Sequence, residues 1–168
     1  MVASEAQTGK TKYFTKNDIR FDRFDVLKAS SAIPFVCKPV RIGGIPYYDG
    51  ALADPVPVEK AFSLGCDKVV LILTKPRDLI RNPKRDLMLA KRVAKKYPLA
   101  AKNLSLRAER YNEGVRLAKE YEAKGKLLIV APKDTCGVDT LKRDPQSLER
   151  LYRYGLDDAE AIESFLKG

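Results

Sequence analysis

Asp49 is the residue of this chain whose side chain and sequence neighbours are best suited to acid-base catalysis. It opens the tripeptide Asp-Gly-Ala and follows the apolar run from Ile45 to Tyr48, which predicts a strand that ends at this carboxylate. A carboxylate can act as a general base and take the proton of a hydroxyl group that attacks an ester carbonyl. The sequence contains no histidine. A nucleophile within it would therefore need a carboxylate or a lysine as its base, because neither a Ser-His-Asp triad nor a Cys-His pair can be built.

Structural roles also explain the two acidic residues of this stretch. An aspartate before glycine often accepts hydrogen bonds from the backbone amides that follow it, which is the structural alternative for Asp49. Asp54 stands before Pro55, a pattern typical of an N-cap acid with proline at the first helical position. It predicts a helix from Pro55 to Leu64 that ends at Gly65. Asp54 is thus expected to cap a helix, and Asp49 remains the candidate catalytic residue.

The elements around Asp49 predict an α/β protein. Gly43 and Gly44 separate two short apolar runs and favour a hairpin. Continuous apolar runs within Asp67 to Thr74 and Lys126 to Ala131 predict strands that are covered on both faces, which is typical of layered α/β folds. Extended stretches are also expected at Val2 to Ala6 and Lys12 to Thr15. Helices are expected at Phe24 to Ala32, at Pro83 to Tyr97 and from Pro98 onward. A last helical segment, Pro145 to Leu166, is expected as two helices with a break at Gly155.

Several short blocks together resemble the patatin-like phospholipases, most closely a bacterial branch of that family. They are Ala-Ser-Ser-Ala-Ile-Pro-Phe at Ala29 to Phe35, Val-Arg-Ile-Gly-Gly-Ile-Pro-Tyr-Tyr-Asp-Gly-Ala from Val40, and Asp-Pro-Val-Pro-Val-Glu-Lys-Ala from Asp54. The resemblance is specific from about Thr8 to Lys75 and weaker from Leu104 to the end. It implies a lipid acyl hydrolase with a Ser-Asp dyad, in which Asp49 matches the aspartate of the family's D-G-G or D-G-A motif.

The family's nucleophile motif is missing from this sequence. None of its serines has glycine two positions before it, so there is no G-x-S-x-G elbow. The family's glycine-rich oxyanion loop is also missing, and in the family both precede the Ala-Ser-Ser-Ala-Ile-Pro block. We therefore expect one partial domain, the carboxy-terminal part of a three-layer patatin-like domain with a mixed sheet, flanking helices and a hairpin. Its parts are core strands, hairpin and D-G-A turn at 1–75, basic helices at 76–125, and a strand with carboxy-terminal helices at 126–168.

The entire excess positive charge falls in one segment. Lys75 to Lys126 holds sixteen Lys or Arg and six Asp or Glu, and the chain as a whole has a formal net charge of +10. A solvated face of amphipathic helices is the commonest meaning of such a run. Attraction to an anionic membrane is the second interpretation, since basic side chains gain about 1 kcal/mol each near such a surface. Nucleic acid is not expected as a partner, because no recognised nucleic-acid-binding motif accompanies the charge.

The remaining expectations concern thiols, cofactors and assembly. Cys37, Cys66 and Cys136 are far apart, form no C-x-x-C pair, and are expected to be reduced and buried in a cytoplasmic protein. No metal or other cofactor is expected, because zinc would lack histidine ligands. Sheet edges left open by a partial domain predict a homo-oligomer.

The functional prediction has two alternatives. The first is a fragment of a phospholipase or esterase that supplies only Asp49, acts on acyl lipids or esters when complete, and is inactive alone. The second is a non-catalytic basic α/β module that binds an anionic membrane or an acidic partner.

Overall fold

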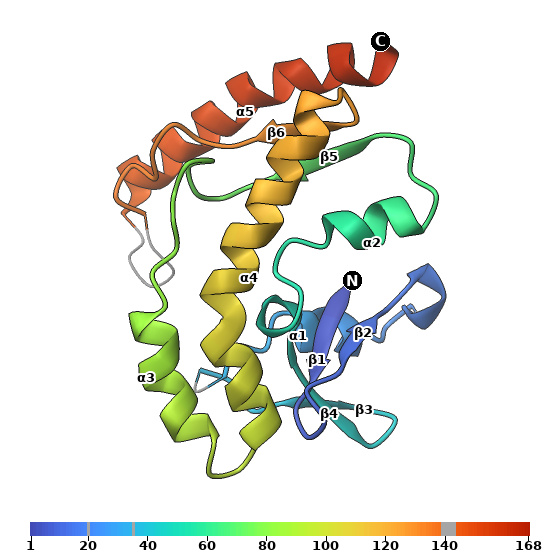
Figure 1. The fold of residues 1–168 in the computed structure, drawn as a ribbon, viewed down its shortest axis with the longest axis vertical. Coiled ribbons are helices and arrows are strands. Elements are labelled where there is room, and N and C mark those ends of the chain that lie inside the picture. Colours follow the sequence, from blue (N-terminus) through green and yellow to red (C-terminus); the bar gives the residue numbers. More distant parts are fainter. Residues whose placement is uncertain (20, 35, 139–143) are drawn as a thin grey trace. The chain divides into compact units, whose positions relative to one another are not determined.

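The chain folds as an α/β protein with two compact units (Figure 1). The structure, a computed structural model, describes residues 1–19, 21–34, 36–138 and 144–168. The first unit comprises Met1–Val56 and Arg81–Glu113, and the second comprises Pro57–Ile80 and Gly114–Gly168. Parallel and antiparallel strand pairs both occur, in two separate sheets. The expected α/β class is confirmed, whereas the expectation of one partial domain stays a prediction.

The sheet of the first unit is antiparallel and has the strand order β2-β1-β4-β3. Its hairpin is confirmed: Gly43 and Gly44 have φ angles of 57° and 81°, which glycine adopts without strain. The expected extended stretches near the amino terminus are confirmed as β1 and β2, which also pair with each other. The strands span Val2–Glu5 (β1), Thr11–Tyr13 (β2), Val40–Ile42 (β3) and Ile45–Asp49 (β4).

Helix α1, Asp25–Ser30, packs on this sheet. Val26 and Ala29 are buried and belong to the same core cluster as Ala3, Phe14 and Tyr47. Phe24 and Leu27 are 53% and 45% exposed. The helix predicted from Phe24 to Ala32 is present but begins at Asp25, so Phe24 is its N-cap residue. Phe35, the last residue of the Ala-Ser-Ser-Ala-Ile-Pro-Phe block, lies outside the described residues.

Two helices complete the core of the first unit. They are α3, Lys84–Val93, and the amino-terminal part of α4, Pro98–Ala123, as the three-four spacing of their apolar residues predicted. The ring of Tyr97, between them, meets the ring of Tyr48 on β4 edge to face at 5.7 Å. The buried members of this cluster are Ala6, Ala32, Tyr48, Leu52, Ala90, Val93, Ala100, Ala101 and Leu104.

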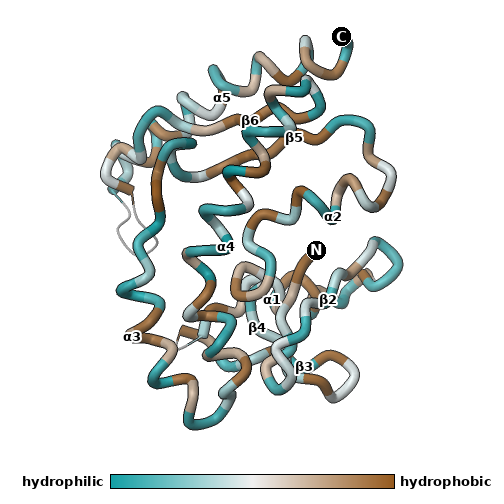
Figure 2. The backbone as a smooth tube through the Cα atoms, in the orientation of Figure 1, coloured by the Kyte–Doolittle hydropathy of each residue, from teal (hydrophilic) through white to brown (hydrophobic). Residues whose placement is uncertain are grey.

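The second unit contains a parallel strand pair. Strands β5, Val69–Ile72, and β6, Leu127–Val130, pair in parallel, and both stand out as hydrophobic stretches in Figure 2. Both strands were predicted, but β5 is not covered on both faces, since Ile72 is 67% exposed. The helices of this unit are α2, Val58–Ser63, the carboxy-terminal part of α4, and α5, Pro145–Lys167.

Asp54 does not cap a helix. Helix α2 begins at Val58, and its N-cap is Pro57. The reason lies in the two prolines: a residue that precedes proline is pushed away from the helical region, so Val56, between Pro55 and Pro57, cannot continue a helix. Asp54 instead accepts a hydrogen bond from the hydroxyl of Tyr13 at 2.6 Å.

Gly155 does not break the last helix, because α5 runs without interruption from Pro145 to Lys167. Glycine inside a helix costs about 1 kcal/mol relative to alanine, which lowers stability but does not by itself end a helix. The side chain of Asp144 caps this helix by accepting hydrogen bonds from the backbone N–H and the hydroxyl of Ser147, at 2.9 and 2.6 Å. A capped amino terminus and a long apolar face therefore outweigh the glycine.

Candidate functional site

Two backbone contacts fix the position of Asp49. It is the last residue of β4, it pairs with Ala3 of β1, and its amide donates a 2.9 Å hydrogen bond to the carbonyl of Ala32. Its side chain is the N-cap of the short 3₁₀ helix η2, Gly50–Leu52, where Oδ1 accepts a 2.8 Å hydrogen bond from the amide of Ala51. The carboxylate therefore has a fixed orientation, with Oδ2 free of hydrogen bonds to any of the described residues.

Gly50 is needed here for space, not for an unusual backbone angle. Gly50 is not among the residues with positive φ. A Cβ atom at this position would instead stand 2.4 Å from the carbonyl oxygen of Val2. Glycine thus lets η2 pass close to the backbone of β1, directly after Asp49 at the end of the inner strand β4.

Burial sets the electrostatic character of Asp49. Burial raises the pKa of its carboxyl group above the ordinary value, while the amide of Ala51 and the guanidinium of Arg107 act in the opposite direction. A carboxylate whose pKa is raised is a stronger base toward a hydroxyl proton. Asp49 lies in the antiparallel sheet of the first unit, whereas the described parallel pair, β5 and β6, lies in the second.

Two charged neighbours of this region, Arg107 and Asp86, were not predicted from the sequence. Nε of Arg107, on α4, and Oδ2 of Asp86, on α3, lie 3.6 Å apart, and both side chains are largely buried. Neither atom has a hydrogen-bond partner among the described residues. Burial lowers the pKa of Arg107, as does Arg81. The signal that could have found Arg107 is its place on the apolar face of α4, three residues after Leu104, where a charge is unusual.

No serine forms a hydrogen bond with Asp49 within the described ranges. Ser4 is fully buried one position along β1 from the residue that pairs with Asp49. Because side chains alternate along a strand, Ser4 and Ala3 face opposite sides of the sheet. The hydroxyl of Ser4 instead lies 3.3 Å from the amide nitrogen of the Asn103 side chain.

The second unit holds a separate apolar cavity of about 220 Å³. It lies where β5 and β6 end and where α5 passes over them, and it is lined by Ile72, Val130, Leu151, Asp158 and Ile162 among others. Asp49, the candidate catalytic residue, does not line it.

Metal binding and membrane crossing find no support in the part of the chain that the structure describes. It contains no group of three or more Cys, Asp or Glu residues placed to hold a metal ion. None of the described helices combines the length and the apolar character that spanning a bilayer requires. The thiols are free, as expected, but Cys37 and Cys66 are exposed, so the prediction of three buried cysteines was wrong. Both lie outside the regular elements, after α1 and α2, where little packs over them.

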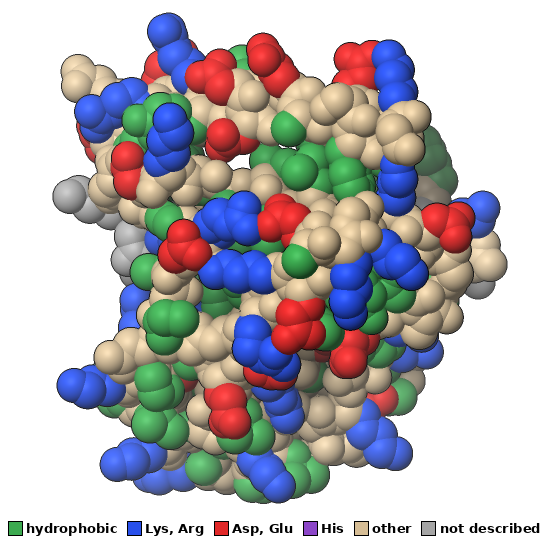
Figure 3. Space-filling model, turned by 45° about the horizontal axis from the view of Figure 1, so that its top comes forward, with side chains coloured by type: hydrophobic (Ala, Val, Ile, Leu, Met, Phe, Trp, Pro, Cys, Tyr) green, Lys and Arg blue, Asp and Glu red, His purple; other side chains and the backbone are tan. Residues whose placement is uncertain are grey.

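The basic segment is partly neutralised by its own acidic residues. Lys119 pairs with Asp78 at 2.7 Å, Arg116 pairs with Glu120, and Arg77 pairs with Glu122. Lys and Arg side chains lie among Asp and Glu side chains on the face seen in Figure 3. This agrees with a solvated face of amphipathic helices for much of the segment.

Comparisons with known proteins agree with an α/β protein that is patatin-like in its amino-terminal part. Residues 4–62, which include Asp49, match the family described as Patatin-like phospholipase, a match that supports a lipid hydrolase-like family. Residues 97–167 match a different family, described as Domain of unknown function (DUF6363). The patatin match therefore does not extend into the stretch from Leu104 onward.

A particular relative is similar over part of the chain. It is Uncharacterized protein YjjU of Escherichia coli (strain K12), 42% identical over 60 residues. The similarity covers 35% of this chain and 17% of the length of that protein.

Proposed function

We propose that this chain supplies the carboxylate of a Ser-Asp dyad in a lipid acyl hydrolase of the patatin-like type. The observation that carries the proposal is the half-buried carboxylate of Asp49, with one oxygen held by Ala51 and the other free of described partners. The patatin-like match at residues 4–62 supports it, since Asp49 falls inside the matched stretch.

The proposed mechanism uses Asp49 as a proton carrier. As a serine oxygen attacks the acyl carbonyl, Oδ2 of Asp49 takes the hydroxyl proton. When the tetrahedral intermediate collapses, the leaving alcohol receives that proton and the acyl group stays on the serine. A water molecule then attacks the acyl-serine ester, again losing its proton to Asp49, and the serine recovers its proton as the fatty acid leaves.

The nucleophile of this mechanism comes from outside these residues. No serine of the sequence stands in a G-x-S-x-G elbow, and in the described ranges none is hydrogen-bonded to Asp49. We propose that residues 1–75 correspond to the carboxy-terminal part of a patatin-like core, whose elbow serine lies in another segment. The chain alone is then inactive toward esters.

The test is reconstitution with a polypeptide segment that carries a G-x-S-x-G elbow from a patatin-like protein. Hydrolysis of a short-chain nitrophenyl ester is measured for the chain, for the segment and for the mixture. We expect activity only in the mixture, and a loss of about 100-fold or more with the Asp49→Asn variant. Ester turnover by the chain alone that is abolished in Asp49→Ala would overturn the assignment of the nucleophile to another segment. A mixture that keeps full activity with Asp49→Asn would overturn the role of Asp49.

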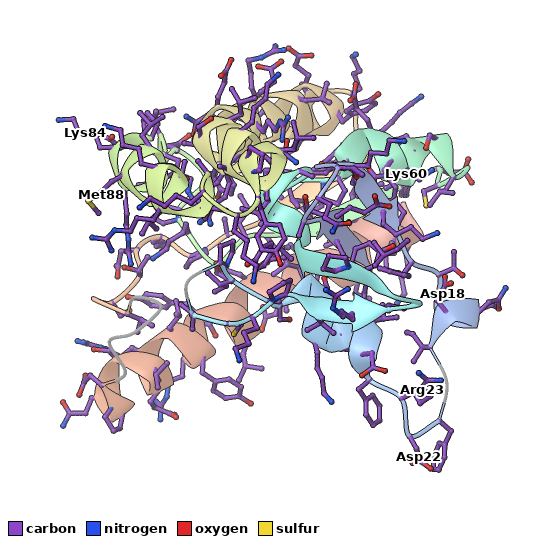
Figure 4. The ribbon with its side chains drawn as sticks, turned by 90° about the horizontal axis from the view of Figure 1, so that it is seen from below. Asp18, Asp22, Arg23, Lys60, Lys84 and Met88 are labelled. Carbon is purple, nitrogen blue, oxygen red and sulfur yellow. The ribbon has the colours of Figure 1, made fainter. Side chains whose placement is uncertain are left out.

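A second candidate function is binding to an anionic membrane surface through α3. This helix exposes Leu87 and Met88, which are 45% and 54% exposed, next to the basic residues Lys84, Lys91 and Arg92. Lys84 and Met88 both project outward from α3 (Figure 4). Apolar and basic side chains on one exposed helix are typical of helices that lie in a membrane interface.

Vesicle flotation tests this second function. We expect the chain to float with vesicles that contain phosphatidylglycerol, to stay unbound with phosphatidylcholine alone, and to be released by about 0.5 M salt. Met88→Gln should weaken binding, whereas Leu156→Gln, which changes an equally exposed residue of α5, should not. Equal flotation of the chain with both kinds of vesicle would exclude α3 as the binding surface. So would equal flotation of the Met88→Gln and Leu156→Gln variants with phosphatidylglycerol vesicles.

A further inference from the structure

Two arginines of the first unit, Arg81 and Arg107, lie beside the same tyrosine. Arg81 precedes α3, and its guanidinium lies 5.4 Å above the ring of Tyr111 on α4. Tyr111 is four residues after Arg107, so the two side chains are neighbours on one face of that helix. The backbone of Arg81 is fixed by Asn112, whose side chain accepts from its N–H at 2.8 Å and donates to its carbonyl at 3.1 Å. Arg81 and Arg107 therefore both lie next to Tyr111.

Arg85, an exposed residue of α3, adds a third positive charge to the other two. It directly precedes Asp86, the residue whose carboxylate lies 3.6 Å from Arg107. Arg81 and Arg85 both lower the pKa of Arg107, the effect expected of positive charges close to it. We call Arg81, Arg85 and Arg107 the arginine cluster.

The protein neutralises this cluster only in part. Asp86 faces Nε of Arg107, and Asp49 is the other acidic group that acts on Arg107. Within the described ranges, no ion pair or hydrogen bond reaches the guanidinium groups of Arg81 and Arg85. Arg110, close by on α4, is already engaged with the carbonyl of Leu52 at 3.0 Å and with Asn103 at 3.1 Å. The three guanidinium groups therefore have more hydrogen-bond donors and more positive charge than the neighbouring carboxylates can pair with and neutralise.

We propose that Arg81, Arg85 and Arg107 form a binding site for a phosphate group. Guanidinium groups donate paired hydrogen bonds that match the oxygens of phosphate, and a tetrahedral phosphate offers enough oxygens to engage three of them. The phosphate can belong to a lipid headgroup or be free in solution, since both present the same oxygens. The inference goes beyond the proposed function, because it holds whether or not Asp49 acts as a base.

The test measures direct binding by isothermal titration calorimetry at constant ionic strength. The ligands are inorganic phosphate, a dihexanoyl phosphatidic acid below its micelle concentration, and the matching diacylglycerol, which lacks phosphate. Saturable 1:1 binding of both phosphate compounds supports a site for free phosphate, and binding of the phosphatidic acid alone supports a headgroup site. Failure of both to bind, or equal binding of the diacylglycerol, overturns the proposal.

Substitutions locate the binding. Arg81→Gln and Arg85→Gln should each weaken phosphate binding about tenfold, since each removes a charged donor. Lys102→Gln is the matched control, because Lys102 is an exposed residue on α4 that points away from Arg107. The proposed site is overturned if phosphate affinity is unchanged in both arginine variants. It is also overturned if Lys102→Gln reduces phosphate affinity as much as they do. Since no turnover is measured, failure of the hydrolase proposal leaves this result intact.

Discussion

The hydroxyl of Tyr13, on β2, donates a 2.6 Å hydrogen bond to Oδ2 of Asp54, which lies 41 residues further along the chain. The bond ties the edge strand of the antiparallel sheet to the segment that leaves η2. It gives Asp54 a role that its place before Pro55 did not predict, and it holds the chain a few residues beyond Asp49. The contact is therefore part of the framework that positions the candidate catalytic carboxylate.

Removal of this hydroxyl should destabilise the protein. We expect Tyr13→Phe to lower the free energy of unfolding by about 1 to 2 kcal/mol, because a partly buried carboxylate loses its donor. Urea denaturation monitored by circular dichroism measures the change. Tyr152→Phe, at an exposed tyrosine of α5, should alter stability by less than about 0.5 kcal/mol. Equal effects of the two substitutions would show that the hydrogen bond does not contribute.

Gly50→Ala should be strongly destabilising. The new Cβ atom would stand 2.4 Å from the backbone oxygen of Val2, and backbone cannot move aside as a flexible side chain can. We expect a loss of about 3 kcal/mol in the free energy of unfolding, from the shift forced on β1 or η2. Thermal denaturation of the two proteins would measure it. A variant as stable as the natural protein would contradict the close approach of η2 to β1.

Asp49→Asn should make the protein more stable at neutral pH while it removes the proposed activity. The raised pKa of Asp49 means that the folded protein holds this proton more tightly than the unfolded chain. The stability contributed by the protonated group is therefore complete at low pH and is lost as the pH rises from 3.8, the ordinary pKa of an aspartate, through the folded-state pKa. Asparagine stays neutral throughout this window.

Denaturation at several values between pH 3 and pH 7 measures this linkage. The difference between Asp49→Asn and the natural protein should be small at the lowest pH and should grow in favour of the variant as pH increases. Asp54→Asn serves as the comparison at a second acid of the same region. A difference for Asp49→Asn that stays constant over the whole range would contradict the raised pKa.

Local sequence signals predicted the elements of this fold better than their exact limits. Gly43 and Gly44 between apolar runs were sufficient for the hairpin, and the run before Asp49 was sufficient to place that carboxylate at the end of a strand. The start of α2 was missed because Pro57 outweighs the capping pattern at Asp54 and Pro55.

Tertiary contacts account for what could not be predicted. The pairing of β1 with β4, which fixes Asp49, joins segments over forty residues apart, and neither carries a signal for the other. Arg107, Asp86 and Arg81 come together only because α3 and α4 pack in one unit. The role of Gly50 likewise depends on Val2, so it could not be derived from the Asp-Gly pair alone.

Open sheet edges predict self-association. Strands β2 and β3 form the edges of the antiparallel sheet, and unpaired strand edges favour pairing between chains. We expect dimers or larger assemblies in light scattering at micromolar concentration. Because Cys37 and Cys66 are exposed, the measurement needs a reducing agent, or the variant with both changed to serine, to exclude disulfide-linked dimers. A strictly monomeric sample under these conditions would contradict the prediction.

Gly155→Ala should have the opposite sign from Gly50→Ala, because the two glycines serve different purposes. Gly155 lies inside the continuous helix α5, and a Cβ atom there would meet nothing within 4 Å. Alanine restricts the unfolded chain and favours the helix, so we expect the free energy of unfolding to rise by about 0.5 to 1 kcal/mol. Thermal denaturation measures the gain, and the helical signal in circular dichroism should not fall. A loss of stability would instead indicate that the chain bends at Gly155, as two separate helices would require.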